Sequence, residues 1–349
     1  MKEAQAGETP DSYRSPPHHH QPPMTPAAAT MRGAGSPRYT ADADHQRVAA
    51  LSSRPTSASF DANGTTDMKT TAAPSWNTQD LGWRIGADCT AAASAGILVA
   101  PVVTAIDRAI IENASGRSTL RNSLLGSLRT LLVRPHTYIF SRPFALIFAL
   151  YTGTYLTANT LDTTTSVLHS TPASSTTAGA PKFVATSSAN LALCLYKDSR
   201  FTRMFGLTSG APRPVPTATY ALFALRDCLT VFASFNVPPL LAPALAARID
   251  RTTGALGDAL RRHVDAASAA QFAAPAAVQV FSTPLHLLGL DLYNRPRGSP
   301  GVGFAQRLGK VTSNWGTSCL ARMARIVPAF GCGGVVNLRV RRALMGKLE

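Results

Sequence analysis

Acidic residues, and charged residues in general, are scarce in this sequence. Only 19 of the 349 residues are Asp or Glu, and charged residues together make up 15% of the chain. Soluble domains usually carry about 25% charged residues, so the deficit argues against an ordinary soluble protein and points toward a membrane.

Cysteine and catalytic motifs are also largely missing. The five cysteines form no Cys-x-x-Cys pair, and each lies in or beside an apolar run. This excludes a disulfide framework and a zinc site, and it predicts buried, unpaired thiols. The sequence contains no His-Glu-x-x-His motif, no glycine-rich phosphate loop between a strand and a helix, and no nucleophile elbow. We therefore expect no cofactor, no bound metal and no enzymatic activity.

The positive charge belongs to one part of the chain. Residues 1–80 hold 7 Lys or Arg and 8 Asp or Glu, a net charge of −1, whereas residues 81–349 hold 27 and 11, a net charge of +16. The basic residues stand mostly at the ends of apolar runs, without a nucleic-acid-binding motif, so nucleic acid is not an expected partner. Contact of long basic side chains with anionic lipid headgroups explains them, and a cavity that attracts anions is the alternative.

Composition divides the chain into two parts. Residues 1–80 are rich in Pro, Ser, Thr, Ala, Gly and His, with few large apolar side chains. Such a segment cannot bury enough surface to offset its chain entropy, so we expect residues 1–80 to be a disordered tail. Residues 81–346 hold the apolar runs and are expected to form one membrane domain in the lipid bilayer.

Six apolar runs follow one another in this second part. They span residues 83–111, 137–161, 183–196, 217–245, 266–292 and 317–344. The second run is the clearest, and it is long enough to cross a hydrocarbon layer of about 30 Å. Runs two and four lack the polar stripe of a surface helix. A soluble helical bundle is the alternative for the weaker runs, several of which are interrupted by polar residues or proline.

A basic segment with helical periodicity connects the first two runs. In residues 116–132, leucines fall on one helical face, and Asn, Ser, Gly and Thr fill the other. This pattern is typical of a short amphipathic helix that lies at a membrane interface. Residues 303–311, between runs five and six, repeat the pattern less clearly.

Three polar residues, Asp107, Asp198 and His286, lie at nearly equal spacing in or directly after the odd-numbered runs. Asp107 and Asp198 are 91 positions apart (198 − 107), and His286 follows Asp198 after 88 positions (286 − 198). Together with the basic segments, this spacing predicts an all-α membrane fold. We expect six transmembrane helices arranged in three helix–amphipathic helix–helix repeats.

In this arrangement residues 81–346 resemble the mitochondrial carrier family, and they are similar to fungal membrane proteins of that superfamily. Odd-numbered helices of the family end in a Pro-x-acid-x-x-base signature, whose acids and bases pair to close a central cavity on the matrix side. Asp107 and Asp198 match the acid, Pro284 matches the proline, and His286 stands in the place of an acid. The positions of the bases hold Ile110, Phe201 and Gly289 instead.

Arginines inside the even-numbered runs are the candidates for a substrate site. Charged residues within a membrane are functional candidates by default. In this sequence they are Arg142, Arg226, Asp227, Arg322 and Arg325. Arg325 begins an Arg-x-x-Pro stretch that resembles one in the sixth carrier helix, and Arg142 and Arg226 occupy comparable places. If the even runs line a cavity, these three arginines would make it positive and suited to a small anion. The alternative is that they pair with neighbouring acids or reach the lipid headgroups.

Two functions are therefore open. The resemblance implies a multi-pass protein of the inner mitochondrial membrane that transports a small anionic metabolite. The missing bases leave the expected gate without its ion pairs, and a ligand can shift a protein between states only by its differential affinity. A carrier-derived membrane scaffold without transport is therefore the alternative.

Overall fold

The structure is a computed structural model. It describes residues 77–349 except 207–212, 297 and 299–300. The tail predicted for residues 1–80 therefore lies outside the described residues, apart from its last four positions.

Helices are the regular elements of the described residues, and no β-strand occurs in this part of the chain. In chain order the helices are α2 (Leu81–Ser115), α3 (Leu120–Val133), α4 (Pro135–Ile139), α5 (Arg142–His169), α6 (Gly179–Phe205), α7 (Thr217–Asn236), α8 (Pro238–Arg251), α9 (Gly254–His263), α10 (Ala266–Ala277), α11 (Gln279–Asn294), α12 (Phe304–Ala324), the π-helix η1 (Val327–Cys332) and α13 (Gly333–Met345).

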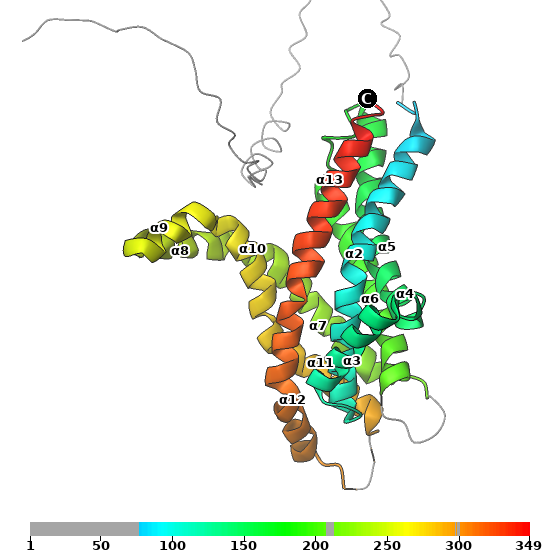
Figure 1. The fold of residues 1–349 in the computed structure, drawn as a ribbon, viewed down its shortest axis with the longest axis vertical. Helices are drawn as coiled ribbons and strands as arrows, with labels where there is room; N and C mark the ends of the chain where they lie inside the picture. Colours follow the sequence, from blue (N-terminus) through cyan, green and yellow to red (C-terminus); the bar gives the residue numbers. More distant parts are fainter. Residues whose placement is uncertain (1–76, 207–212, 297, 299–300) are drawn as a thin grey trace, which may run out of the picture. The chain divides into compact units, whose positions relative to one another are not determined.

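The long helices form six segments that pack in chain order. The segments are α2, α5, α6, α7 with α8, α10 with α11, and α12 with η1 and α13. Each segment contacts the next, and α13 closes the ring by packing on α2 (Figure 1). Apolar side chains from successive segments share one core, which includes Val99, Ile147, Phe201, Phe223 and Leu290. Polar side chains on the core-facing sides of these helices are therefore brought together inside the ring.

Four of the described helices are long and apolar enough to cross a membrane. They are Leu81–Ser115, Thr217–Asn236, Ala266–Asn294 and Phe304–Met345. The prediction of six spans in three repeats is thus confirmed only in a coarser form: the described residues are helical and include four candidate spans. Segments α5 and α6 are long helices that fall short of this apolarity, although residues 137–161 are the clearest span in the sequence. The reason is the polar second half of α5 and the charged second half of α6.

Proline interrupts three of the segments. Helix α7 ends at Asn236 and α8 begins at Pro238, because proline has no N–H and its ring clashes with the preceding turn. Pro275 lies near the end of α10, and Pro328 lies at the start of η1. Helix α8 packs on α7, α9 and α10, and Figure 1 shows α8 and α9 turned aside from α2 and α13.

Glycine lets α2 approach α5 and α13 closely. A Cβ at Gly96 would overlap the side chain of Thr152 in α5. A Cβ at Gly333 in α13 would lie 2.7 Å from Cγ2 of Val99 in α2 and 2.5 Å from the Tyr155 hydroxyl oxygen in α5. The same hydroxyl donates a hydrogen bond to the carbonyl of Ala329 at 2.8 Å, which ties α5 to η1. Close approach through small residues is the usual way in which helices associate within lipid.

Helix α3 is the amphipathic helix expected between the first two runs. Its Ser123 and Ser127 side chains are buried, whereas Leu128 and Leu132 are exposed. The Ser123 hydroxyl donates a hydrogen bond to the carboxylate of Glu112 near the end of α2. The polar face therefore packs on the protein and the apolar face points outward, as contact with a lipid interface requires.

The five cysteines are unpaired, as the sequence indicates. Cys194 and Cys319 are buried, but Cys89, Cys228 and Cys332 are exposed. The expectation of buried thiols is therefore wrong for three of the five, because these side chains lie outside the packed contacts between helices.

Candidate functional site

Charged side chains on the core-facing sides of the helices point into the interior of the ring. On α2, Asp107 continues the buried stripe of Val99 and Val103 and is itself only 5% exposed. Asp198 of α6 and Arg226 of α7 are each 1% exposed. A buried charge is unfavourable unless it is paired and hydrogen-bonded, so the position of each of these groups depends on its partners.

These side chains form a group that we term the central network. Its members are Asp107, Lys197, Asp198, Arg226, Asp227, His286, Arg322 and Arg325. They come from α2, α6, α7, α11 and α12, with Arg325 at the C-terminal cap of α12.

Asp107 is shared by two cations from different segments. Lys197 Nζ lies 2.8 Å from its Oδ2, and Arg325 Nη1 donates to its Oδ1 at 2.6 Å. The same Lys197 Nζ lies 2.5 Å from Oδ1 of Asp198. These ion pairs connect α2 with α6 and with the end of α12.

Arg226 makes the other contacts of the network. Its Nη2 lies 2.6 Å from Oδ2 of Asp198 and 2.6 Å from Oδ2 of Asp227, and its Nε donates to Oδ1 of Asp227 at 2.9 Å. Its Nη1 lies 2.7 Å from Nδ1 of His286. Because a guanidinium can only donate, this contact requires a neutral imidazole whose Nδ1 accepts. The contacts join α7 to α6 and α11.

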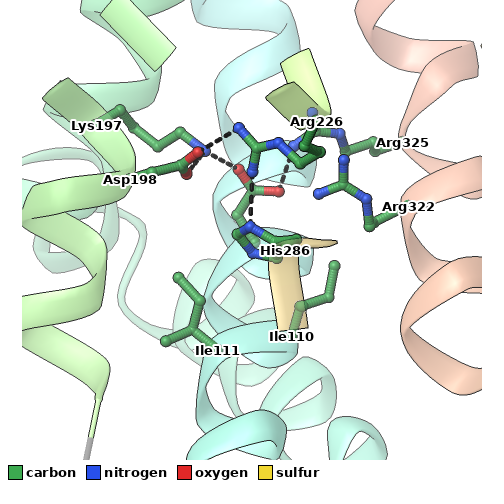
Figure 2. A pocket seen from close by; sticks show the side chains of 9 residues that line it. Ile110, Ile111, Lys197, Asp198, Arg226, His286, Arg322 and Arg325 are labelled. Atoms are coloured by element: carbon green, nitrogen blue, oxygen red, sulfur yellow. Dashed lines mark hydrogen bonds and ion pairs between the residues drawn. The ribbon is translucent and has the colours of Figure 1, made fainter. Parts of the chain in front are cut away.

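The network surrounds a narrow crevice inside the ring (Figure 2). Ile110 and Ile111 supply the apolar part of its wall. The crevice leaves no room for the centre of a water molecule. Paired side chains therefore fill the interior at this level and hold the helices together.

The three polar residues that are evenly spaced in the sequence lie together in this network. Asp107, Asp198 and His286 come from three different segments and line the same crevice. Pro284 lies inside α11, two residues before His286, and its ring is half-buried. Residues that are about ninety positions apart in the sequence are thus neighbours in the structure.

Two of the three candidate arginines belong to the network. Arg226 and Arg325 line the crevice, but each is paired with a carboxylate. The interior is therefore not the uniformly positive cavity that three arginines would make. Arg142 is exposed at the first position of α5, where Ser141 caps the helix, and it does not line the crevice.

Lys197 is the functional candidate that the sequence analysis missed. It is adjacent to Asp198, directly after the apolar run 183–196 of α6, and only 3% of its surface is exposed. A lysine beside an aspartate at the end of an apolar run is the signal that could have identified it. Lys197, Arg226 and Arg325 supply the basic partners that are absent from the signature positions.

A second polar group, the outer network, joins α2, α5 and α13. It consists of the buried residues Asp88, Asn159, Thr163, Asn337 and Arg341. Arg341 donates through Nε to Oδ1 of Asp88 at 2.7 Å and through Nη2 to Oγ1 of Thr163 at 2.9 Å. The side-chain amides of Asn159 and Asn337 donate to each other, both at 2.9 Å.

The two networks lie near opposite ends of α2. Asp88 and Asp107 are 19 positions apart (107 − 88). At the 1.5 Å rise of an α-helix this is about 28 Å, close to the hydrocarbon thickness of about 30 Å.

Comparison with known proteins places the chain in a family. The family described as "Probable citrulline exporter" matches residues 91–345, well over half of the chain. None of the curated proteins matches the sequence. The resemblance to the mitochondrial carrier family is therefore wrong. It rested on isolated acids at a regular spacing and one Arg-x-x-Pro stretch, each of which is common by itself. This chain belongs to the probable citrulline exporter family.

Proposed function

We propose that this protein is a multi-pass membrane transporter of citrulline or a similar zwitterionic amino acid. Its family is described as a probable citrulline exporter, and four of its described helices are apolar enough to cross a membrane. The observation that carries the proposal is the central network, because it presents buried carboxylates and buried guanidinium groups to one crevice.

The charges of the network match those of an amino acid. Citrulline has one carboxylate, one ammonium group and a neutral ureido group. The three carboxylates of the network suit the ammonium group, and its guanidinium groups suit the carboxylate. Four cations against three carboxylates leave a formal charge of +1 (4 − 3) with a neutral imidazole. The small anion expected from the sequence is less well matched if it carries several charges, because the network has only one cation in excess.

The two networks suit the two closures of a protein that opens to one side at a time. The central network joins α2, α6, α7, α11 and α12, and the outer network joins α2, α5 and α13. A solute that binds at the crevice competes for the ion pairs there, and it can shift the protein only through this difference in affinity. In our proposal the protein has two states. In one, the central network opens on its side of the membrane while the outer network stays closed. In the other, the outer network opens while the central network stays closed.

All six segments cross the membrane in this proposal, as three pairs with connecting helical stretches. The support is the packing of the segments in chain order and the contact of α13 with α2. The polar residues of α5 and α6 include buried members of both networks, such as Asn159 and Asp198. Polar side chains that face the interior of a bundle do not prevent a helix from crossing lipid.

The alternative of a scaffold without transport rested on the absence of basic partners for Asp107 and Asp198. Both carboxylates have such partners in the structure, so this argument loses its basis. The inner mitochondrial location and the contact with anionic lipid headgroups stay predictions. Imaging of the tagged protein against a mitochondrial marker tests the location.

Transport by the purified full chain in liposomes tests the proposal. We expect labelled citrulline to enter liposomes that are preloaded with unlabelled citrulline faster than it enters protein-free liposomes. Dicarboxylates and nucleotides should compete poorly for this entry. Citrulline flux equal to that of protein-free liposomes would contradict transport of citrulline, and stronger competition by dicarboxylates would support an anion carrier instead.

A further inference from the structure

One cation of the central network has no carboxylate partner among the described residues. Lys197 contacts two aspartates, Arg226 contacts two, and Arg325 contacts one. Arg322 instead donates through Nε to the side-chain oxygen of Gln279 at 2.9 Å. Arg322 is nevertheless only 2% exposed.

The guanidinium of Arg322 faces the crevice. It lines the same space as Asp107 and His286, and Figure 2 shows its terminal nitrogens pointing toward the middle of the group. A guanidinium has five N–H donors, of which the Nε–H is used by Gln279. The four remaining donors form a planar fork that matches the two oxygens of a carboxylate.

Gln279 holds this guanidinium in place. Its amide nitrogen donates to the carbonyl of Pro275 at 2.9 Å, and its oxygen accepts from the hydroxyl of Ser282 at 3.1 Å as well as from Arg322. Gln279 is 2% exposed. Because its amide is fixed at both ends, the orientation of Arg322 is set before a ligand arrives.

We propose that Arg322, positioned by Gln279, binds the carboxylate of the transported solute. A buried guanidinium without a counter-charge is unfavourable, and a ligand carboxylate removes that penalty on binding. The inference rests on the proposed function, and it names the side chain that recognises the amino acid. The other three cations hold the helices together, whereas Arg322 is available to the solute.

The thermal unfolding of the purified full chain in detergent tests the assignment. We expect citrulline to raise the unfolding temperature of the unaltered chain, because a ligand that binds the folded state stabilises it. Citrullinamide, in which a carboxamide replaces the carboxylate, should give little or no shift. An equal shift with both compounds would overturn the proposal.

Arg322→Met separates binding from folding. Replacing an uncompensated buried charge by an apolar side chain of similar length should raise the unfolding temperature without ligand, while the shift with citrulline disappears. Arg322→Lys keeps the charge but loses the planar fork, so the Kd for citrulline should rise about tenfold or more. A lower unfolding temperature for Arg322→Met together with an unchanged citrulline shift would show a structural role only.

Gln279→Glu provides an independent test of the role of Arg322. It places a carboxylate beside Nε of Arg322, so the unfolding temperature without ligand should rise and citrulline should bind more weakly. Arg261→Met is the matched control for Arg322→Met, because Arg261 is an exposed arginine of α9, and it should leave the shift with citrulline unchanged. Gln279→Glu with undiminished citrulline binding would contradict the proposal.

The failure of this inference differs from failure of the proposed function. If citrulline does not stabilise the unaltered chain and is not transported, the proposed function fails. The carboxylate site is then tested with acetate, lactate and benzoate on the unaltered chain and on Arg322→Met. A shift that depends on Arg322 would keep the site, and the absence of any shift would remove it.

Discussion

The central and outer networks are built from similar residues but balance their charges differently. In the outer network one arginine faces one aspartate, and the other donors of Arg341 meet Thr163 and the carbonyl of Ala173. In the central network four cations meet three carboxylates, and Arg322 is held by an amide oxygen. A balanced buried pair is complete without a ligand, whereas an extra guanidinium still lacks a counter-charge. The outer network therefore suits a closure alone, whereas the central network suits recognition of the solute as well as closure.

The N-terminal part of α2, near the outer network, holds one more buried arginine. Arg84, one turn before Asp88, is buried. The carboxylate of Glu349 accepts hydrogen bonds from the backbone and hydroxyl of Ser174 at 2.8 and 2.6 Å. Burial by itself raises the pKa of Glu349, but Ser174 and the nearby Arg84 lower it below its usual value. Nε and Nη1 of Arg84 nevertheless have no hydrogen-bond partner among the described residues.

The largest effect is expected from Asp198→Asn in the central network. The substitution removes the carboxylate that Lys197 and Arg226 share, leaves each of these buried cations with one other aspartate, and raises the excess of cations in the network from one to two. Removing one partner of a buried pair costs about 3–5 kcal/mol. The unfolding temperature should therefore fall steeply, and citrulline transport into liposomes should be lost.

Asp258→Asn is the matched control for this variant. Asp258 pairs with Arg261 at the surface of α9, and its side chain is 59% exposed. Exposed pairs contribute about 0–1 kcal/mol, so this variant should unfold near the temperature of the unaltered chain. Similar losses in the two variants would remove the distinction between the buried network and the solvated surface.

Asp88→Asn tests the outer network alone. It removes the charge opposite Arg341, which keeps its hydrogen bonds to Thr163 and to the Ala173 carbonyl. We expect a loss near the lower end of about 3–5 kcal/mol, the range for removing one partner of a buried pair, because the two remaining hydrogen bonds still hold Arg341. The shift of the unfolding temperature by citrulline should remain, because the recognition groups lie in the central network. Loss of that shift would show that the two networks do not divide their roles.

Gly96→Ala tests the packing between the two networks. The added Cβ would overlap the Thr152 side chain, and overpacking of this kind costs about 1–3 kcal/mol. Gly86→Ala in the same helix meets no atom within contact distance and should be neutral or stabilising, because alanine favours helix. Equal unfolding temperatures for the two variants would contradict the close approach of α2 and α5.

The smallest effect is expected from the amide pair of the outer network. Asn159→Leu, Asn337→Leu and the double variant form a thermodynamic cycle that isolates their mutual hydrogen bonds. Interhelical hydrogen bonds in membranes average about 0.6 kcal/mol, so the coupling energy from denaturant unfolding should be of that size. A coupling energy as large as the loss in Asp198→Asn would reverse the ranking of the two networks.

The helices themselves follow closely from the sequence. The apolar run at 83–111 corresponds to α2 (Leu81–Ser115), which Gly116 ends in the left-handed conformation that glycine adopts without strain. The amphipathic leucine pattern at 116–132 corresponds to α3. Local periodicity and chain-breaking residues are enough for such assignments because helical hydrogen bonds are local.

The limits of the sequence appear at α5 and at Arg142. The apolar middle of α5 is visible in the sequence, but its polar second half meets α2 and α13 in the outer network. Arg142 and Arg325 look alike as arginines within apolar runs. One is exposed at a helix start, and the other is 2.6 Å from Asp107. Their difference depends on which helix face turns inward.

By itself the sequence determined a helical, apolar chain with its excess of basic residues after position 80, and it placed Asp107, Asp198 and His286 at related positions. Only the tertiary structure decided which charges meet, because ion pairing depends on a few ångströms between helices that lie far apart in the chain. Arg325 reaches Asp107 across 218 positions, and Arg322 is left without an aspartate by the same packing. Periodicity in the sequence indicates which face of a helix is buried, but the register between neighbouring helices decides which charged residue pairs with which.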